Sequence, residues 1–393
     1  MFENQIMSQD YLKNEPFTTY LNFELYSLEM RVHTEKNEIG VAEFRGGKMK
    51  KAIVTLLVLM MAMALFAGGT DEKPAATTEA DNGPKGTVMV YTSTGETVML
   101  ALKAAFEEKY PGITLEYYYG GSGKVVTKLS TEFQTKAVSC DIVWMADPSA
   151  MLTWKKEGNL VAYKSPNADP IDPIFKDPDD MFTAARMVIM GIGYSEIACS
   201  DEEAPYSFRG MVDPKFYGQI VMADPANAGT TKACVYALVN NPDYGWKFFE
   251  DFKANGGELE ASSGSNMNKV VAAAYKLCIA VDYTCKNMKE NDSPIGFHNT
   301  TDVVCAVPCP IAITKGAPHE ETAKILYDWL LDPEGGQKVL ANSCNMTVVN
   351  PNTVIPEGMI RADEAAKIAM PIDWNDLSEN GAAMLEKFDK IFK

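Results

Sequence analysis

A strand, a tight turn and the start of a helix follow one another in Gln219-Ile220-Val221-Met222-Ala223-Asp224-Pro225-Ala226-Asn227-Ala228-Gly229-Thr230-Thr231. The apolar part, Ile220 to Ala223, predicts a short buried strand. Asp224-Pro225 and the residues before Gly229 predict a turn, because proline fixes φ and glycine permits positive φ. A helix that begins at Gly229 presents unpartnered N–H groups, which favour an anion. Taken alone, the stretch is explained more simply by an ordinary threonine-capped helix.

The chain on either side repeats this alternation of strand and helix. Apolar segments at Thr87–Tyr91, Ile113–Tyr119 and Asp141–Met145 predict strands, with amphipathic helices between them. Such spacing is typical of βαβ units in a mostly parallel sheet. Two longer apolar strands, Met187–Tyr194 and Val303–Thr314, flank a second α/β set that contains the opening stretch. We therefore expect an α/β fold of two lobes.

Three loops meet the rule that ligands bind beyond the carboxyl ends of strands in such sheets. Each follows a predicted strand, precedes a helix and offers N–H groups with hydroxyls nearby. Two belong to the first lobe and one to the second, which predicts an anion held in the cleft between the lobes. They are Thr92-Ser93-Thr94, Gly121-Ser122-Gly123 and Ala228-Gly229-Thr230-Thr231. A fourth candidate, Ser262 to Asn266, is equally well explained as a solvated loop.

Composition narrows the class of protein. The 393 residues suffice for two domains, and 46% hydrophobic with 23% charged residues is typical of a soluble globular chain. A net charge of −17 disfavours binding to nucleic acid, which requires cations that neutralise phosphates. The same charge disfavours adhesion to an anionic membrane surface.

One segment near the start is not globular. Met49-Lys50-Lys51 precedes an almost wholly apolar run, Ala52–Ala67, and small and polar residues follow it. This order predicts a secretory signal peptide at 49–67 and a polar linker at 68–86. The run is short for a transmembrane helix, although an uncleaved anchor is the alternative. Residues 1–48 are then an upstream extension without a role in folding, and the protein is periplasmic or otherwise extracytoplasmic.

The cysteines and histidines do not predict a zinc site. With three histidines and no CxxC pair, the ligand spacing of such a site is absent. Most cysteines lie within apolar runs, where cysteine serves as a small core residue, although export also permits disulfides. The eight are Cys140, Cys199, Cys234, Cys278, Cys285, Cys305, Cys309 and Cys344.

No catalytic pattern stands out. The chain has no GxSxG or HExxH motif and no Cys/His pair. Asp141 and Asp147 could form a carboxylate pair, but capping of loop ends explains them more simply. We predict a protein that is not an enzyme and that holds no cofactor.

A resemblance to a known family rests on segments that occur in order from about Val88 to Val349. They are VMVYTST, GGSGKVVTKLSTE, CDIVWMADPSAM, EGNLVAYKSPNA, DPKFYGQIVMADPANAGTT and AITKGAPHEETAKILYDWLLDPEGGQKVLA. The chain resembles the extracellular solute-binding proteins of ABC importers, in the ferric-iron-binding-like group, which includes phosphonate and sugar-phosphate binders.

The resemblance implies a type II periplasmic-binding-protein fold, with two lobes that close on a ligand by a hinge. Residues 87–190 plus 308–393 would form lobe 1, and 191–307 would form lobe 2. The two long apolar strands would cross the hinge. The protein would perform no catalysis and would act as a monomer that hands its solute to an ABC permease in the cytoplasmic membrane.

The resemblance leaves two classes of ligand. Members that bind phosphorylated solutes carry a strand, loop and helix like ADPANAGTT, which implies a phosphate- or phosphonate-bearing anion here. Those members usually have Gly-Glu at Ala274-Tyr275 and a Pro–acid–Gly loop at His298–Asp302, where this chain differs. His298 could reach an anion in the cleft, but as a lone loop histidine it is expected to be exposed. The implied ligand-binding residues are Ser93, Thr94, Ser122, Gly123, Ala228, Gly229, Thr230, Thr231 and Tyr283.

The alternative ligand is ferric iron. Ferric-binding members place two adjacent tyrosines on the metal, from the region that matches Ile279–Cys285. This chain has a single tyrosine there, Tyr283, beside Asp282 and Thr284. Phenolate and carboxylate oxygens suit Fe(III). Under this alternative, Tyr283 and Asp282 would bind transported iron, with an accompanying anion at the helix that begins at Gly229.

Overall fold

The computed structural model describes residues 83–393. The predicted signal peptide at 49–67, the extension at 1–48 and most of the linker at 68–86 lie outside the described residues. The described residues, 83–393, belong to one compact unit. Within the described part, no helix combines the length and the apolar character needed to cross a bilayer.

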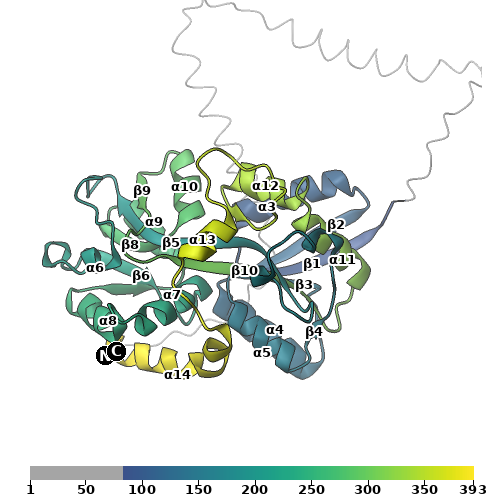
Figure 1. Cartoon of the computed structure of the whole chain (residues 1–393), viewed down its shortest axis with the longest axis horizontal. Coiled ribbons are helices and arrows are strands. Elements are labelled where there is room, and N and C mark those ends of the chain that lie inside the picture. Colours follow the sequence, from purple (N-terminus) through teal and green to yellow (C-terminus); the bar gives the residue numbers. More distant parts are fainter. Residues whose placement is uncertain (1–82) are drawn as a thin grey trace, which may run out of the picture. The chain divides into compact units, whose positions relative to one another are not determined.

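One mixed sheet of eleven strands runs through this unit, and β5 and β10 occupy its centre (Figure 1). Along its main path the order is β2-β1-β3-β10-β5-β8-β6-β7, while β4, β9 and β11 pair at its side. The strands are β1 (Gly86–Thr92), β2 (Ile113–Tyr119), β3 (Ile142–Trp144), β4 (Leu160–Val161), β5 (Thr183–Ser195), β6 (Ile220–Ala223), β7 (Glu258–Glu260), β8 (Leu277–Val281), β9 (Ile295–His298), β10 (Cys305–Thr314) and β11 (Thr347–Val348).

The sheet consists of two parallel halves joined by antiparallel strands. β1 pairs in parallel with β2 and β3, and we call these three strands the first half. β6 pairs in parallel with β7 and β8, which form the second half. β10 and β5 run antiparallel to each other, and they also run antiparallel to β3 and β8 respectively. The predicted parallel pairing is confirmed within each half, and the two long apolar strands lie between the halves.

Helices cover the sheet. They are α3 (Glu96–Lys109), α4 (Ser122–Thr135), α5 (Pro148–Lys156), α6 (Phe208–Met211), α7 (Gly229–Asn240), α8 (Gly245–Ala254), α9 (Ser263–Val271), α10 (Asp282–Glu290), α11 (Glu320–Leu331), α12 (Gly336–Cys344), α13 (Ala362–Ile368) and α14 (Trp374–Phe392). The C-terminal α14 contacts α5, which follows β3, and α7 and α8, which follow β6 (Figure 1). The hydroxyl of Tyr236 on α7 donates to Asp376 at 2.8 Å. This helix therefore connects elements of both halves.

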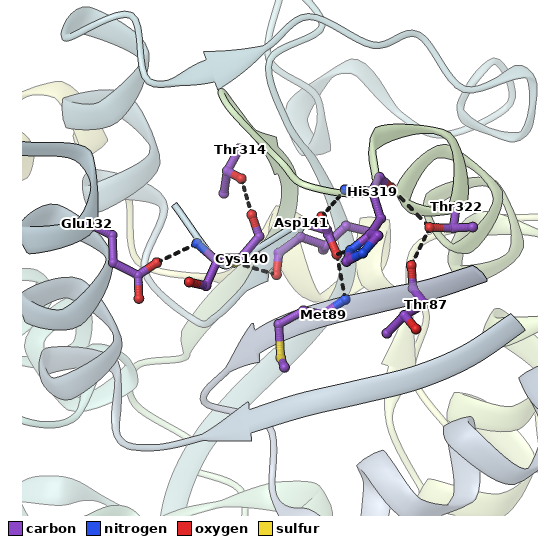
Figure 2. Close-up of polar contacts among 10 residues, drawn as sticks. Thr87, Met89, Glu132, Cys140, Asp141, Thr314, His319 and Thr322 are labelled. Carbon is purple, nitrogen blue, oxygen red and sulfur yellow. Dashed lines mark hydrogen bonds and ion pairs between the residues drawn. The ribbon is translucent and has the colours of Figure 1, made fainter. Parts of the chain in front are cut away.

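Asp141 is a buried structural residue (Figure 2). It directly precedes β3 and accepts hydrogen bonds from the backbone N–H of Met89 and from the backbone N–H of His319, both at 2.7 Å. The ring Nδ1 of His319 lies 3.0 Å from its Oδ2. Asp141 thus ties β1, β3 and the start of α11 together, in agreement with a cap of loop ends.

All eight cysteines are free and buried. Burial raises the pKa of the Cys140 and Cys285 thiols well above the ordinary value. The prediction that the cysteines serve as core residues is confirmed, and none of the eight forms a disulfide in this structure.

The opening stretch folds as expected, with β6 at Ile220–Ala223 and α7 beginning at Gly229. Both long strands begin elsewhere than predicted, β5 at Thr183 rather than Met187 and β10 at Cys305 rather than Val303. The fourth candidate loop becomes helical from Ser263, because Ser262 and Ser265 form a capping box that stabilises the first turn. The division into lobes at 190/191 and 307/308 stays a prediction.

Candidate functional site

A cavity of about 110 Å³ lies where strands of both halves end. Its wall contains residues from the loops after β1, β2, β3, β6, β7 and β8, together with β5 at its floor. Parallel strands point their carboxyl ends to the same edge, so each half contributes three loops. The wall residues are Ser93, Gly95, Tyr119, Gly121, Ser122, Ala146, Arg186, Val188, Asn227, Ala228, Gly229, Thr230, Ser262, Ser263, Gly264, Met267, Val281, Tyr283 and Thr284.

The structure brings the three predicted loops together at this cavity. Ser93 and Ser122 of the first half face the same space as the Ala228-Gly229-Thr230 segment of the second half. The fourth candidate loop also reaches it through Ser262, Ser263 and Gly264. The predicted loops of both halves therefore share one cavity, and their role in ligand binding stays a prediction.

Helices α3, α4 and α7 begin at the cavity, and in the described structure no side chain caps their first turns. Their N-cap positions are Gly95, Gly121 and Ala228, of which none has a side-chain acceptor. The first turns of α4 and α7 also contain no acidic residue. Uncapped helix N-termini carry partial positive charge and unpaired N–H donors, which suit an anion.

Arg186 lies at the floor of the cavity. It is on β5, and only 1% of its surface is exposed. One terminal nitrogen donates to the hydroxyl of Thr94 at 3.1 Å, whereas its Nε and other terminal nitrogen have no partner. The guanidinium lies 5.4 Å from the Trp144 ring centre and 5.1 Å from that of Tyr283. Burying unpaired charged donors is costly, so this side chain calls for an acceptor inside the cavity.

The sequence analysis missed Arg186. A usable signal was present, because a charged residue directly precedes the apolar run that begins at Met187. A strand whose residues are all buried rarely carries an arginine unless the charge has a partner or a function. The predicted strand began one residue too late to include it.

Three of the predicted ligand-binding residues lie behind the cavity wall instead. Thr94 is buried, and its hydroxyl is occupied by Arg186. Gly123 donates its N–H to the carbonyl of Asn227 at 3.2 Å. Thr231 is buried, and its hydroxyl has no partner. Thr94 therefore affects the site through its hydrogen bond with Arg186. Gly123 affects it through its hydrogen bond to Asn227 in the loop after β6.

Tyr283 and Asp282, the pair of the iron alternative, do not share the site cavity. Tyr283 lines both this cavity and a second one of about 570 Å³, whereas Asp282 lines the second cavity and not the first. Asp282 accepts a hydrogen bond from the backbone of Ile189 at 3.3 Å, and desolvation raises its pKa to about 7. Residues 83–393 contain no group of three or more His, Cys, Asp or Glu side chains positioned to hold a metal.

The expectation that His298 is an exposed loop residue was wrong. His298 ends β9, which pairs with β5, and its side chain is 6% exposed. Its Nε2 lies 2.9 Å from a carboxylate oxygen of Asp201, and its ring stacks on Tyr206 with 3.8 Å between centroids. The polar residues around it concealed the strand pairing, and His298 does not line the site cavity.

The family of the chain follows from its sequence. Residues 138–380, more than half of the chain, match the model of the bacterial extracellular solute-binding proteins. The chain therefore belongs to this family, which confirms the resemblance to the solute-binding proteins of ABC importers. Members of the family bind solutes outside the cytoplasm for transport and are not enzymes as a class.

Two relatives cover most of the chain. An uncharacterized protein of Haemophilus influenzae is 24% identical over 297 residues, which are 70% of this chain and 80% of the relative. A provisionally named 2-aminoethylphosphonate-binding periplasmic protein of Salmonella typhimurium is 23% identical over 298 residues, which are 72% of this chain and 84% of the relative.

Solved structures share the fold. The periplasmic binding protein AfuA from Actinobacillus pleuropneumoniae, with exogenous fructose-6-phosphate bound, has a TM-score of 0.69 at 21% identity and covers 79% of this chain and 99% of its own. Iron-bound HitA from Pseudomonas aeruginosa has a TM-score of 0.66 at 15% identity, covering 78% and 99%. The predicted type II periplasmic-binding fold is thereby confirmed.

Proposed function

We propose that this protein captures a small phosphate- or phosphonate-bearing anion in the cavity at the strand ends and delivers it to an ABC permease in the cytoplasmic membrane. The signal peptide at 49–67 exports it, and it acts as a monomer without catalysis. One observation carries the choice of an anion. Arg186 lines a cavity at which three uncapped helices begin, and two nitrogens of its buried guanidinium have no hydrogen-bond partner.

The donor set matches the oxygens of such a ligand. The unpartnered Nε and Nη1 of Arg186 lie on different edges of the guanidinium, so each would donate its own charge-assisted hydrogen bond to a ligand oxygen. Helix N-termini and the hydroxyls of Ser93, Ser122 and Thr230 then surround the remaining oxygens. Burial strengthens these contacts, because the effective dielectric constant inside the protein is below that of water.

The charges of the wall favour an anion over ferric iron. Among the described residues that line the cavity, Arg186 is charged and none carries a carboxylate. A trivalent cation held by Tyr283 would approach a guanidinium only 5.1 Å from the centre of that ring. Like charges at this range repel strongly in a buried site. The names of AfuA's bound sugar phosphate and of the Salmonella relative agree with a phosphorus-bearing anion.

The lobes belong to the same proposal. We place the boundary between lobe 1, residues 87–190 plus 308–393, and lobe 2, residues 191–307, on the two central strands. The cavity wall supports this division, because it combines loops of both sheet halves. Bending of β5 and β10 would open and close the cavity.

The test is thermal unfolding of the purified exported protein with inorganic phosphate, a phosphonate, several sugar phosphates or ferric citrate. A ligand that binds only the folded state at a hundredfold excess over its dissociation constant adds about 2.7 kcal/mol of stability. We expect the midpoint to rise with phosphorus-bearing anions. A rise with ferric citrate alone, together with a visible phenolate colour, would overturn the proposal.

A further inference from the structure

Two loops from opposite halves of the sheet contact each other beside the cavity. One follows β3 and the other follows β6, although β10, β5 and β8 separate these strands in the sheet. The ammonium of Lys232 on α7 lies 2.5 Å from a carboxylate oxygen of Asp147. It also donates to the hydroxyl of Ser149 at 2.9 Å. The pair joins residues 85 positions apart.

The ion pair between Lys232 and Asp147 is largely buried, and both carboxylate oxygens of Asp147 have partners. The Asp147 side chain is 4% exposed and that of Lys232 is 16% exposed. The other oxygen of Asp147 accepts from the Ser149 hydroxyl at 2.6 Å and from the backbone N–H of Ala150 at 3.3 Å. Most ion pairs within the described helices are instead exposed neighbours on one helix, such as Lys247 with Asp251. Removing one partner of such a pair, while the other stays buried, destabilises the arrangement that buries them by several kcal/mol.

Backbone contacts accompany the ion pair. The N–H of Gly123 donates to the carbonyl of Asn227 at 3.2 Å. A Cβ added to Gly229 would lie 2.5 Å from the carbonyl oxygen of Ala146, a distance that real Cβ atoms do not adopt. Ala146, Asn227 and Gly229 all line the cavity. The loop after β6 therefore approaches the loops after β2 and β3 as closely as backbones allow at the rim of the site.

We propose that Lys232 is a positioning residue for the anion site, because its ion pair with Asp147 holds the loops of the two halves together around the ligand. This inference rests on the proposed function and adds an element that the ligand itself does not touch, since Lys232 does not line the cavity. When the halves separate, both charges return to water. The pair therefore stabilises the closed form, with or without a ligand, and adds little to the stability of the open form.

The first test compares Lys232→Met with Lys232→Arg, using inorganic phosphate as the probe in titration calorimetry and stopped-flow dissociation. Lys247→Met serves as the matched control, because it removes an exposed lysine from an ion pair within α8, the helix that follows α7. We expect the dissociation constant of Lys232→Met to rise about tenfold or more through faster dissociation, and Lys232→Arg to recover most of the loss. The unfolding midpoint of the ligand-free protein should match that of the control.

Two results would overturn the inference. In the first, Lys232→Met binds phosphate as the wild type does. In the second, it loses as much stability without ligand as it loses affinity, which indicates a merely structural lysine. If Lys232→Met fails to fold, Lys232→Gln with Asp147→Asn removes both charges at once and is read in the same way.

A second measurement separates this inference from the proposed function. Hydrogen exchange of the α7 N-terminal amides reports the contact between the loops without any ligand. If the wild type fails to bind inorganic phosphate or any anion of the panel, the proposed function fails. Faster exchange at the start of α7 in Lys232→Met than in Lys247→Met would still support the positioning role, and equal exchange would exclude it.

Discussion

At the scale of single residues, Arg186 combines a cost to folding with a gain in binding. Its guanidinium is buried with two unpaired nitrogens, held by Thr94 and two aromatic rings. A group placed in this way destabilises the empty protein and becomes favourable once an acceptor arrives. The residue that matters most for the ligand is thus expected to reduce stability when the ligand is absent.

Replacement of Arg186 by methionine tests this trade-off. Methionine fills similar space without charge, so we expect the ligand-free protein to gain about 1–2 kcal/mol in free energy of unfolding while phosphate binding is lost. Urea denaturation and calorimetry measure the two effects. Arg209→Met, which removes an exposed arginine, is the control. A variant that binds phosphate with unchanged affinity would remove Arg186 from the site.

Tyr283 separates the two ligand classes with one atom. Its ring faces the guanidinium of Arg186, and a cation–π contact needs the ring and not the hydroxyl. We expect Tyr283→Phe to keep most phosphate affinity and Tyr283→Leu to lose about 1–2 kcal/mol of binding free energy. Calorimetry on both variants checks this. An iron site would show the reverse sensitivity, with loss of binding and colour already in Tyr283→Phe.

At the scale of elements, the starts of α7 and α10 give the sharpest expectations. Gly229 begins α7, and a Cβ added to it would lie 2.5 Å from the backbone oxygen of Ala146. Because that oxygen belongs to the opposite half of the sheet, Gly229→Val should block the close approach of the loops without unfolding either half. Phosphate titration should show no binding, while far-ultraviolet circular dichroism and the unfolding midpoint stay near those of the wild type. Loss of the fold together with binding would contradict this assignment.

The start of α10 makes stability depend on pH. Desolvation raises the pKa of Asp282 to about 7 in the folded protein, whereas its pKa in the unfolded chain is ~3.9. Between these values the folded protein keeps a proton that the unfolded chain has released. This contribution to stability is therefore complete below pH ~4 and is lost as the pH rises through about 7.

Urea denaturation at pH 5 and pH 8 measures the effect. We expect the free energy of unfolding of the wild type, relative to Asp282→Asn, to fall by about 2 kcal/mol between the two pH values. The subtraction removes the contributions of every other titrating group. A pH-independent difference between the two proteins would show that Asp282 is ionised throughout.

Elements built from local patterns could be predicted from the sequence, whereas contacts between distant elements could not. The strand Ile220–Ala223 and the start of α7 at Gly229 follow from apolar periodicity and turn chemistry, which are properties of adjacent residues. His298 and Arg186 depend on pairing with strands far along the chain. The burial of His298 therefore cannot be read from local pattern, whereas Arg186 leaves one local signal, a charge directly before the apolar run that begins at Met187.

At the scale of the whole molecule, the two sheet halves and the loops between them predict a change of shape. If residues 87–190 plus 308–393 and residues 191–307 move as lobes, phosphate should bring them together. We expect small-angle scattering to show a smaller radius of gyration when phosphate saturates the wild type. The change should be reduced in Lys232→Met, and an unchanged radius in the wild type would argue against lobes that move.

The eight buried thiols have a consequence for how the chain matures. All eight thiols are buried and none is in a disulfide, so the described fold does not depend on cross-links. If the chain is exported as we propose, wrong cross-links threaten it earlier, while it is unfolded and its thiols are accessible. Folding ends this exposure, because the core shields the sulfur atoms from oxidants. Burial also raises the pKa of the Cys140 and Cys285 thiols, which makes the reactive thiolate rarer. Fast folding thus protects the thiols from oxidation, and the folded protein is compatible with both reducing and oxidising surroundings.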